Sequence, residues 1–173
     1  MVREDEISAQ GKHPARRGEN SERGALMADT ILQSVCDYFL ACPLMPGNQL
    51  NVEYLPESTR KNGIAFSIDV MPVDPVIRQY LGGDALCQFV FTLSSVNDYG
   101  ESVLQNITNN GLYENLSSWL QRKTRKRDFP NLPTGMTPQR IEAINIGYLF
   151  ESSENTAKYQ IQCRLTYYRE AGS

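Results

Sequence analysis

The pattern of apolar and polar residues predicts a protein built around a β-sheet. Segments of the chain alternate between the two classes with a period of two, so side chains along each segment point in turn to opposite faces of a strand. The pattern predicts five strands, at 51–55, 63–71, 85–95, 140–151 and 158–169. The last two are predicted to form a hairpin around the loop 152–156.

Helical spacing marks two further parts of the chain. Residues 28–42 have apolar positions on one face and are followed by proline, and either Asp29 or Thr30 can cap the N-terminus. Residues 101–125 have the same spacing, with a break predicted at Asn109-Asn110-Gly111 and with Trp119 on the apolar side. The order of elements predicts an α+β fold, in which helices cover one face of a mostly antiparallel sheet of about five strands.

The first 26 residues differ from the rest of the chain. Residues 1–26 contain almost no large apolar side chains, so they cannot bury enough surface to offset the entropy lost on ordering. We therefore predict a disordered polar leader at 1–26 and one folded domain at 27–173. Two interpretations of the leader remain: Met27 is the true start of the protein, or the leader is an arm that becomes ordered on a partner.

Composition places the chain among ordinary globular proteins. Hydrophobic residues make up 40% of its 173 residues and charged residues 21%, with a formal net charge of -3. This charge gives no indication of nucleic-acid binding by the chain as a whole. Because no segment approaches about 18 consecutive apolar residues, we expect no membrane contact through a spanning helix.

The residues that could carry out catalysis are sparse. The single histidine, His13, lies in the polar leader, so no histidine base within the fold is available to a serine or cysteine nucleophile. No C-x-x-C pair occurs among the four cysteines, and no familiar zinc spacing is present. We expect no catalytic residue, no metal and no cofactor, and we predict that the protein is not an enzyme. The cysteines are expected to be reduced, buried thiols in a protein that folds in the cytosol.

A glycine pair lies just before the strand predicted at 85–95. Tyr80-Leu81-Gly82-Gly83-Asp84 lacks the Lys-Ser/Thr of a phosphate-binding loop. A tight turn that uses a glycine with positive φ explains this sequence better.

The densest charge in the chain lies at the C-terminal end of the predicted second helix. Five basic residues are candidate partner contacts: Arg122, Lys123, Arg125, Lys126 and Arg127. Cations at a helix C-terminus are stabilised by the helix dipole, which is one explanation. The other is a protruding loop that contacts an acidic partner surface or passing DNA.

The last predicted strand has one polar face with few charges. Gln160, Gln162 and Thr166 lie on this face, opposite the apolar one. Such a face is compatible with simple exposure to solvent or with an interface between soluble subunits.

Long stretches of the chain resemble a known family of phage proteins. They are MADTILQSVCDYFLACPLM from Met27, YLPE at 54–57, VNDYGESVLQNITNNGLYENLSSWL at 96–120, LPTGMTPQRIEAINIGYLFE at 132–151 and KYQIQCRLTYY at 158–168. Together they resemble the minor capsid or tail terminator proteins of long-tailed bacteriophages that infect Gram-positive gut-type bacteria. The resemblance covers residues 27–169.

The resemblance implies a structural role in the virion. Tail terminators are small α/β domains that form a hexameric ring on the last ring of tail-tube subunits, stop tube polymerisation and present a surface for joining the head. The implied partners are copies of the same chain, the tail tube protein and the head connector or neck protein, with DNA only passing through the lumen. The implied location is the tail or neck of the virion, assembled in the cytoplasm of the bacterial host. The alternative is a head-completion or neck connector adaptor of the same phage.

Overall fold

The computed structural model describes residues 30–45, 50–55, 64–98, 103–153 and 156–172, with the side chains of 98 and 103–110 left aside. The predicted leader 1–26 lies outside these residues. Two helices and seven strands occur in the described residues: α1 (Ile31–Leu40), β1 (Leu50–Val52), β2 (Ala65–Val70), β3 (Val76–Gln79), β4 (Ala85–Asp98), α2 (Val103–Lys126), β5 (Met136–Ala143), β6 (Tyr148–Ser152) and β7 (Thr156–Arg169).

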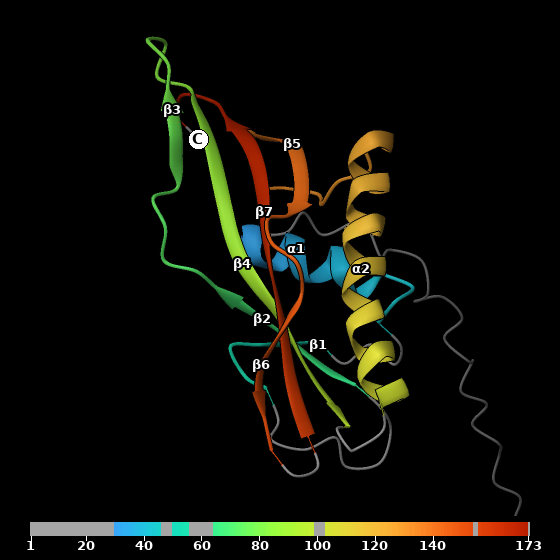
Figure 1. The fold of residues 1–173 in the computed structure, drawn as a ribbon. Helices are drawn as coiled ribbons and strands as arrows, with labels where there is room; N and C mark the ends of the chain where they lie inside the picture. The colour runs from blue at the N-terminus through green and yellow to red at the C-terminus, as the bar shows by residue number, and fades with distance from the viewer. Residues whose placement is uncertain (1–29, 46–49, 56–63, 99–102, 154–155, 173) are drawn as a thin grey trace, which may run out of the picture.

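Two long antiparallel strands form the centre of the sheet (Figure 1). β4 and β7 each have 14 residues, and they pair without a register shift from Ala85 opposite Arg169 to Asp98 opposite Thr156. The alternating burial along β7 confirms the predicted period of two, since every second side chain from Ala157 to Tyr167 is buried.

Each central strand is flanked by two shorter strands on its outer edge. β2 and β3 both pair with β4, and β5 and β6 both pair with β7, all of them antiparallel. β1 extends the sheet by parallel pairing with β2. The α+β class and the mostly antiparallel sheet are therefore confirmed, whereas the predicted count of about five strands is wrong, since the sheet has seven.

The two additional strands have separate causes. β3 lies in a segment where the sequence pattern predicts no strand, and it has only four residues. The single strand predicted at 140–151 is divided into β5 and β6. Ala143 lies opposite Cys163, so a regular ladder would place residue 146 opposite Gln160, yet Tyr148 lies there. Two residues are thus inserted between β5 and β6.

Helix α1 begins where the sequence predicts. Thr30 is the N-cap: its side-chain oxygen accepts a hydrogen bond from the Gln33 amide at 3.1 Å. Asp29, the other candidate cap, lies outside the described residues.

Helix α2 is one continuous helix of 24 residues, so the break predicted at Asn109-Asn110-Gly111 is wrong. A glycine in a helix interior costs only about 1 kcal/mol relative to alanine. Packing of Tyr113, Leu116 and Leu120, all buried, compensates for that cost.

The core lies between the helices and one face of the sheet. Aromatic rings join its parts: Phe39 of α1 lies 5.7 Å from Phe91 of β4, and Tyr38 of α1 lies 5.2 Å from Trp119 of α2, measured between ring centroids. Trp119 is 6% exposed, which confirms its predicted place in the core.

The four cysteines are free and buried, as predicted: Cys36, Cys42, Cys87 and Cys163. Burial raises the pKa of the Cys36, Cys42 and Cys163 thiols. Within the described part of the chain, neither helix combines the length and the apolar character that crossing a membrane requires.

Replacing Trp119 with alanine tests the aromatic core. Trp119→Ala should lower the free energy of unfolding by about 3–5 kcal/mol, because it removes ring contacts with Tyr38 and Phe39 and leaves a cavity. Urea denaturation followed by circular dichroism measures this change. Tyr54→Ala is the control, since Tyr54 is 66% exposed and its loss should change stability by no more than about 0.5 kcal/mol. Equal effects of the two substitutions would contradict the packing described.

Candidate functional site

The hairpin between β3 and β4 projects from the body of the molecule (Figure 1), and Leu81 gives its tip an apolar side chain. The turn is closed by a hydrogen bond from the Tyr80 amide to the Asp84 carbonyl at 2.9 Å. Gly83 has a φ of 94°, which confirms the predicted glycine turn. Leu81 is fully exposed at the tip, and Ile77 is 46% exposed on β3.

The two residues that close this turn, Tyr80 and Asp84, are held to the C-terminal end of β7 and the residues just after it. The Asp84 carboxylate accepts a hydrogen bond from the Ala171 amide at 2.8 Å. A second hydrogen bond, from the Tyr168 hydroxyl, lowers the pKa of Asp84, and Asp84 in turn raises the pKa of Tyr168 to about 12. The rings of Tyr80 and Tyr168 also lie 6.2 Å apart. The exposed tip is therefore carried on an anchored hairpin.

A second exposed apolar surface lies at the insertion between β5 and β6. The Asn145 side chain accepts a hydrogen bond from the Gln162 amide at 2.8 Å, and the Ile144 amide donates to the Gln162 carbonyl at 2.8 Å. These bonds fix the inserted residues against β7. The exposed apolar residues of this stretch form what we call the β6 ridge: Ile144, Ile146, Tyr148, Leu149 and Phe150.

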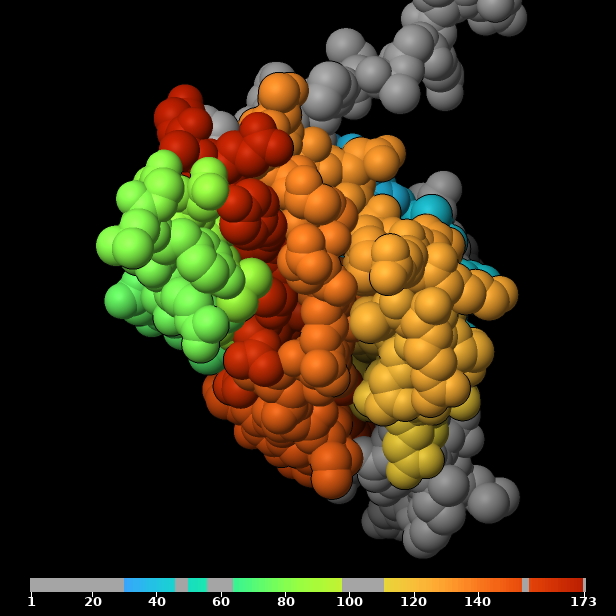
Figure 2. Space-filling view, turned by 90° about the horizontal axis from the view of Figure 1, so that it is seen from above, coloured from blue at the N-terminus to red at the C-terminus, as the bar shows by residue number. Residues whose placement is uncertain are grey.

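A pocket of about 450 Å³ adjoins the β6 ridge. Its walls are Tyr113, Glu114 and Ser117 of α2, Ile161 of β7, and the inserted residues, which include Ile146, itself 82% exposed. The hairpin and α2 lie on opposite sides of the molecule, with β5, β6 and β7 between them (Figure 2). The pocket beside α2 is therefore well separated from the hairpin tip.

A close backbone approach shapes the pocket. A Cβ atom on Gly147 would lie 2.3 Å from the Cβ of Tyr113, so only glycine fits there. Two hydrogen bonds hold the Tyr113 side chain in place. Its hydroxyl is hydrogen-bonded to Ser95 at 2.6 Å and donates to the Tyr159 carbonyl at 3.0 Å. Burial raises the pKa of Tyr113, so this hydroxyl stays protonated.

The predicted basic cluster belongs to the end of α2 rather than to a protruding loop. Arg122, Lys123, Arg125 and Lys126 lie in the last turns of the helix, and Arg127 follows with a φ of 54°. Lys123 is set apart from the others. It pairs with Asp128, and its amino group lies 5.6 Å from the ring centroid of Tyr38 and 5.4 Å from that of Trp119.

The other four basic residues remain exposed. They are Arg122, Arg125, Lys126 and Arg127, and we call them the basic helix end. None of these four forms an ion pair within the described residues, so the basic helix end presents its charge to solvent.

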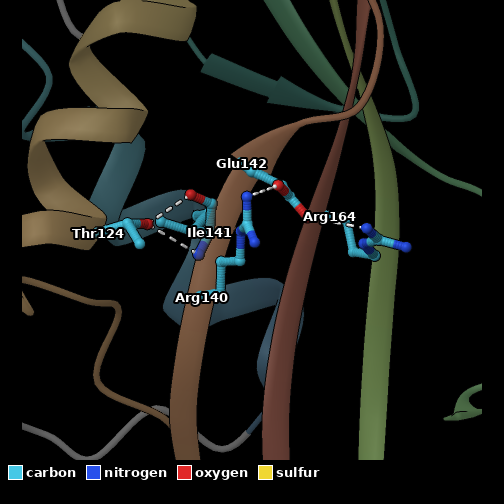
Figure 3. A network of polar contacts seen from close by, with 5 residues as sticks. All are labelled: Thr124, Arg140, Ile141, Glu142 and Arg164. Atoms are coloured by element: carbon cyan, nitrogen blue, oxygen red, sulfur yellow. Dashed lines mark hydrogen bonds and ion pairs between the residues drawn. The ribbon is translucent and has the colours of Figure 1, made fainter.

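The edge of β5 is tied to α2 and to β7 by polar contacts (Figure 3). The Thr124 hydroxyl donates to the Ile141 carbonyl at 2.7 Å and accepts from the Ile141 amide at 3.2 Å. On the opposite face of the sheet, Glu142 pairs with Arg140 at 2.6 Å and with Arg164 at 2.8 Å. The predicted polar face of β7 therefore carries a charged network along its border with β5.

The described ranges contain no group of three or more His, Cys, Asp or Glu side chains that could hold a metal ion. His13 lies outside them.

No protein-family model matches the chain, and a search of curated proteins found no significant match.

The sequence did not reveal the two apolar surfaces. Alternation marked Ile144, Ile146 and Phe150 as one face of a strand, but it does not say whether that face is buried. The place of Lys123 did have a signal, since it follows Trp119 by four residues and so lies next to it on the helix.

Two glycine substitutions test the geometry of the pocket. Gly147→Ala should destabilise the protein by about 1–3 kcal/mol, because the added methyl group collides with Tyr113. Gly111→Ala should stabilise it by about 0.5–1 kcal/mol, because a Cβ there meets no atom within 4 Å and alanine favours the helix. Thermal unfolding of both variants gives the comparison. The same sign for both changes would refute the close approach of Gly147.

The anchor of the hairpin should be sensitive to acid. The pKa of Asp84 is lowered in the folded state, so its contribution to stability is present above the unfolded value of 3.8 and is lost as the pH falls through the folded value. Asp84→Asn should therefore lower the melting temperature at pH 6 and flatten its dependence on pH below 4. Asp74→Asn serves as a control for loss of one acidic charge next to β3. A variant that keeps the acid dependence of the wild-type protein would show that Asp84 is not the group responsible.

Proposed function

We propose that this protein is a structural component of a long-tailed bacteriophage that caps the tail tube as a ring. In this role it ends tube polymerisation and provides the surface that joins the head. It acts by binding other proteins and performs no catalysis.

The observation that carries the proposal is the pair of exposed apolar surfaces on one small domain. Large apolar side chains such as Leu81 at the hairpin tip and Phe150 on the β6 ridge are unfavourable in water, and contiguous exposed apolar surface typically marks a protein interface. An exposed apolar tip on the hairpin and a separate exposed apolar ridge on β6 suit a subunit that contacts more than one neighbour. The sequence resemblance to tail terminators supports the same role.

The basic helix end supplies a different kind of contact. Exposed charges contribute about 1 kcal/mol or less per pair, and they affect the rate of association more than its strength. We assign Arg122, Arg125, Lys126 and Arg127 to guiding an acidic partner surface, such as that of the tube or the head connector. Lys123 has a structural role instead.

Electron microscopy of the purified chain tests the proposed role. Negative staining should show closed rings with a central opening, and added protein should stop the growth of tubes formed by the tail tube protein of the same phage. A monomer that binds only to preformed heads would instead identify a head-completion adaptor. Turnover of a small molecule that is lost on one substitution would contradict the absence of catalysis.

Charge removal tests the basic helix end. Replacing Arg122, Arg125, Lys126 and Arg127 with serine should slow assembly at low salt, and the difference from the wild-type protein should shrink at high salt. The melting temperature should stay nearly unchanged. Lys123→Ser is the contrasting control, which should lower the melting temperature because Lys123 contacts Asp128, Tyr38 and Trp119. Unchanged assembly rates at every ionic strength would show that the four charges only interact with the helix dipole at the C-terminus of α2.

A further inference from the structure

We propose that neighbouring copies of this chain join head to tail, with Leu81 at the hairpin tip of one copy inserted into the pocket beside Tyr113 and Ile146 of the next. This inference rests on the proposed ring and names the surfaces that would form its lateral contact.

The shapes of the two surfaces are complementary. The tip is a protrusion, since Leu81 is fully exposed on an anchored hairpin. The pocket is a concave site of about 450 Å³. Two apolar groups of its wall, the Tyr113 ring and Ile161, are themselves buried in the fold, whereas Ile146 stands exposed at the mouth. A leucine that enters such a site removes its own side chain and part of Ile146 from water.

The charges beside the two surfaces are also complementary. Arg78 lies on β3 of the hairpin and Glu114 on the wall of the pocket, and both are exposed. Neither has an ion-pair partner among the described residues. Docking of the hairpin beside Glu114 gives each charge an opposite partner and favours one orientation of the two copies.

The positions of the surfaces make the contact directional. Because the hairpin and α2, which forms one wall of the pocket, lie on opposite sides of the molecule (Figure 2), the tip and the pocket face different neighbours in the proposed contact. Each copy inserts its tip into one neighbour and receives the tip of another. Such a heterologous contact produces a closed ring when its rotation closes.

Two single substitutions block the two halves of the contact. Leu81→Asp replaces the apolar side chain of the tip with a charge, and Ile146→Asp places a charge at the mouth of the pocket. Because both side chains are exposed, each variant should keep the circular dichroism spectrum and melting temperature of the wild-type monomer. Each alone should remain monomeric by size-exclusion chromatography with light scattering, under conditions in which the wild-type chain forms rings. Tyr54→Asp, an exposed aromatic outside both surfaces, is the control and should still form rings.

Mixing the two variants gives the sharpest test. The Leu81→Asp chain keeps an intact pocket and the Ile146→Asp chain an intact tip, so the mixture should form one-to-one dimers that grow no further. Arg78→Glu should weaken each contact by up to about fivefold, and Glu114→Arg in the same chain should restore it.

The possible results separate this inference from the proposed ring. Rings formed by Leu81→Asp as readily as by the wild-type chain would overturn the head-to-tail contact and leave the ring itself standing. A mixture of variants that yields no dimer would overturn it as well. A wild-type chain that stays monomeric at every concentration would overturn the ring, and the contact with it.

Discussion

The pairing of β4 with β7 is the constraint on which the rest of the structure depends. These strands share 14 consecutive residue pairs, and the other strands attach to them directly or, for β1, through β2. The strict register places Phe91 beside Cys163 and Leu93 beside Ile161 on the face that the helices cover. A slip by one residue would turn these side chains to the opposite face.

The outer strands can depart from regular pairing because the pairing of β4 with β7 stays regular. β3 has a register shift between Val76 and Arg78, and two residues are inserted between β5 and β6. Each irregularity lies at an outer edge, where the central ladder stays intact. Both also lie next to exposed apolar side chains, Ile77 in one case and Ile146 in the other. Irregular edges on a regular centre therefore give this small domain its two protruding features.

The sequence predicted the elements whose apolar residues recur over many positions and lie on one face. The central strands, the Thr30 cap and the buried Trp119 all follow from local spacing. The insertion before β6 could not be detected in this way, because adding two residues preserves a period of two. The continuity of α2 through Gly111 depends on packing by residues further along the helix, which propensity alone does not include.

The candidate site was less accessible to sequence reasoning. Five basic residues drew attention as a group, yet only the fold separates Lys123, which lies over two aromatic rings, from the other four. Leu81 was visible only as part of a turn, since the exposure of its side chain depends on how far the hairpin projects. Burial and protrusion are properties of the folded chain, and a single sequence does not encode them in a local pattern.

The double hydrogen bond of Thr124 has a consequence for aggregation. An open strand edge can recruit strands from other molecules and extend a sheet without limit. At Ile141 both backbone groups that point away from β7 are already bonded to the Thr124 hydroxyl, so an incoming strand finds neither donor nor acceptor there. One helical side chain thus closes this point of the edge to sheet extension.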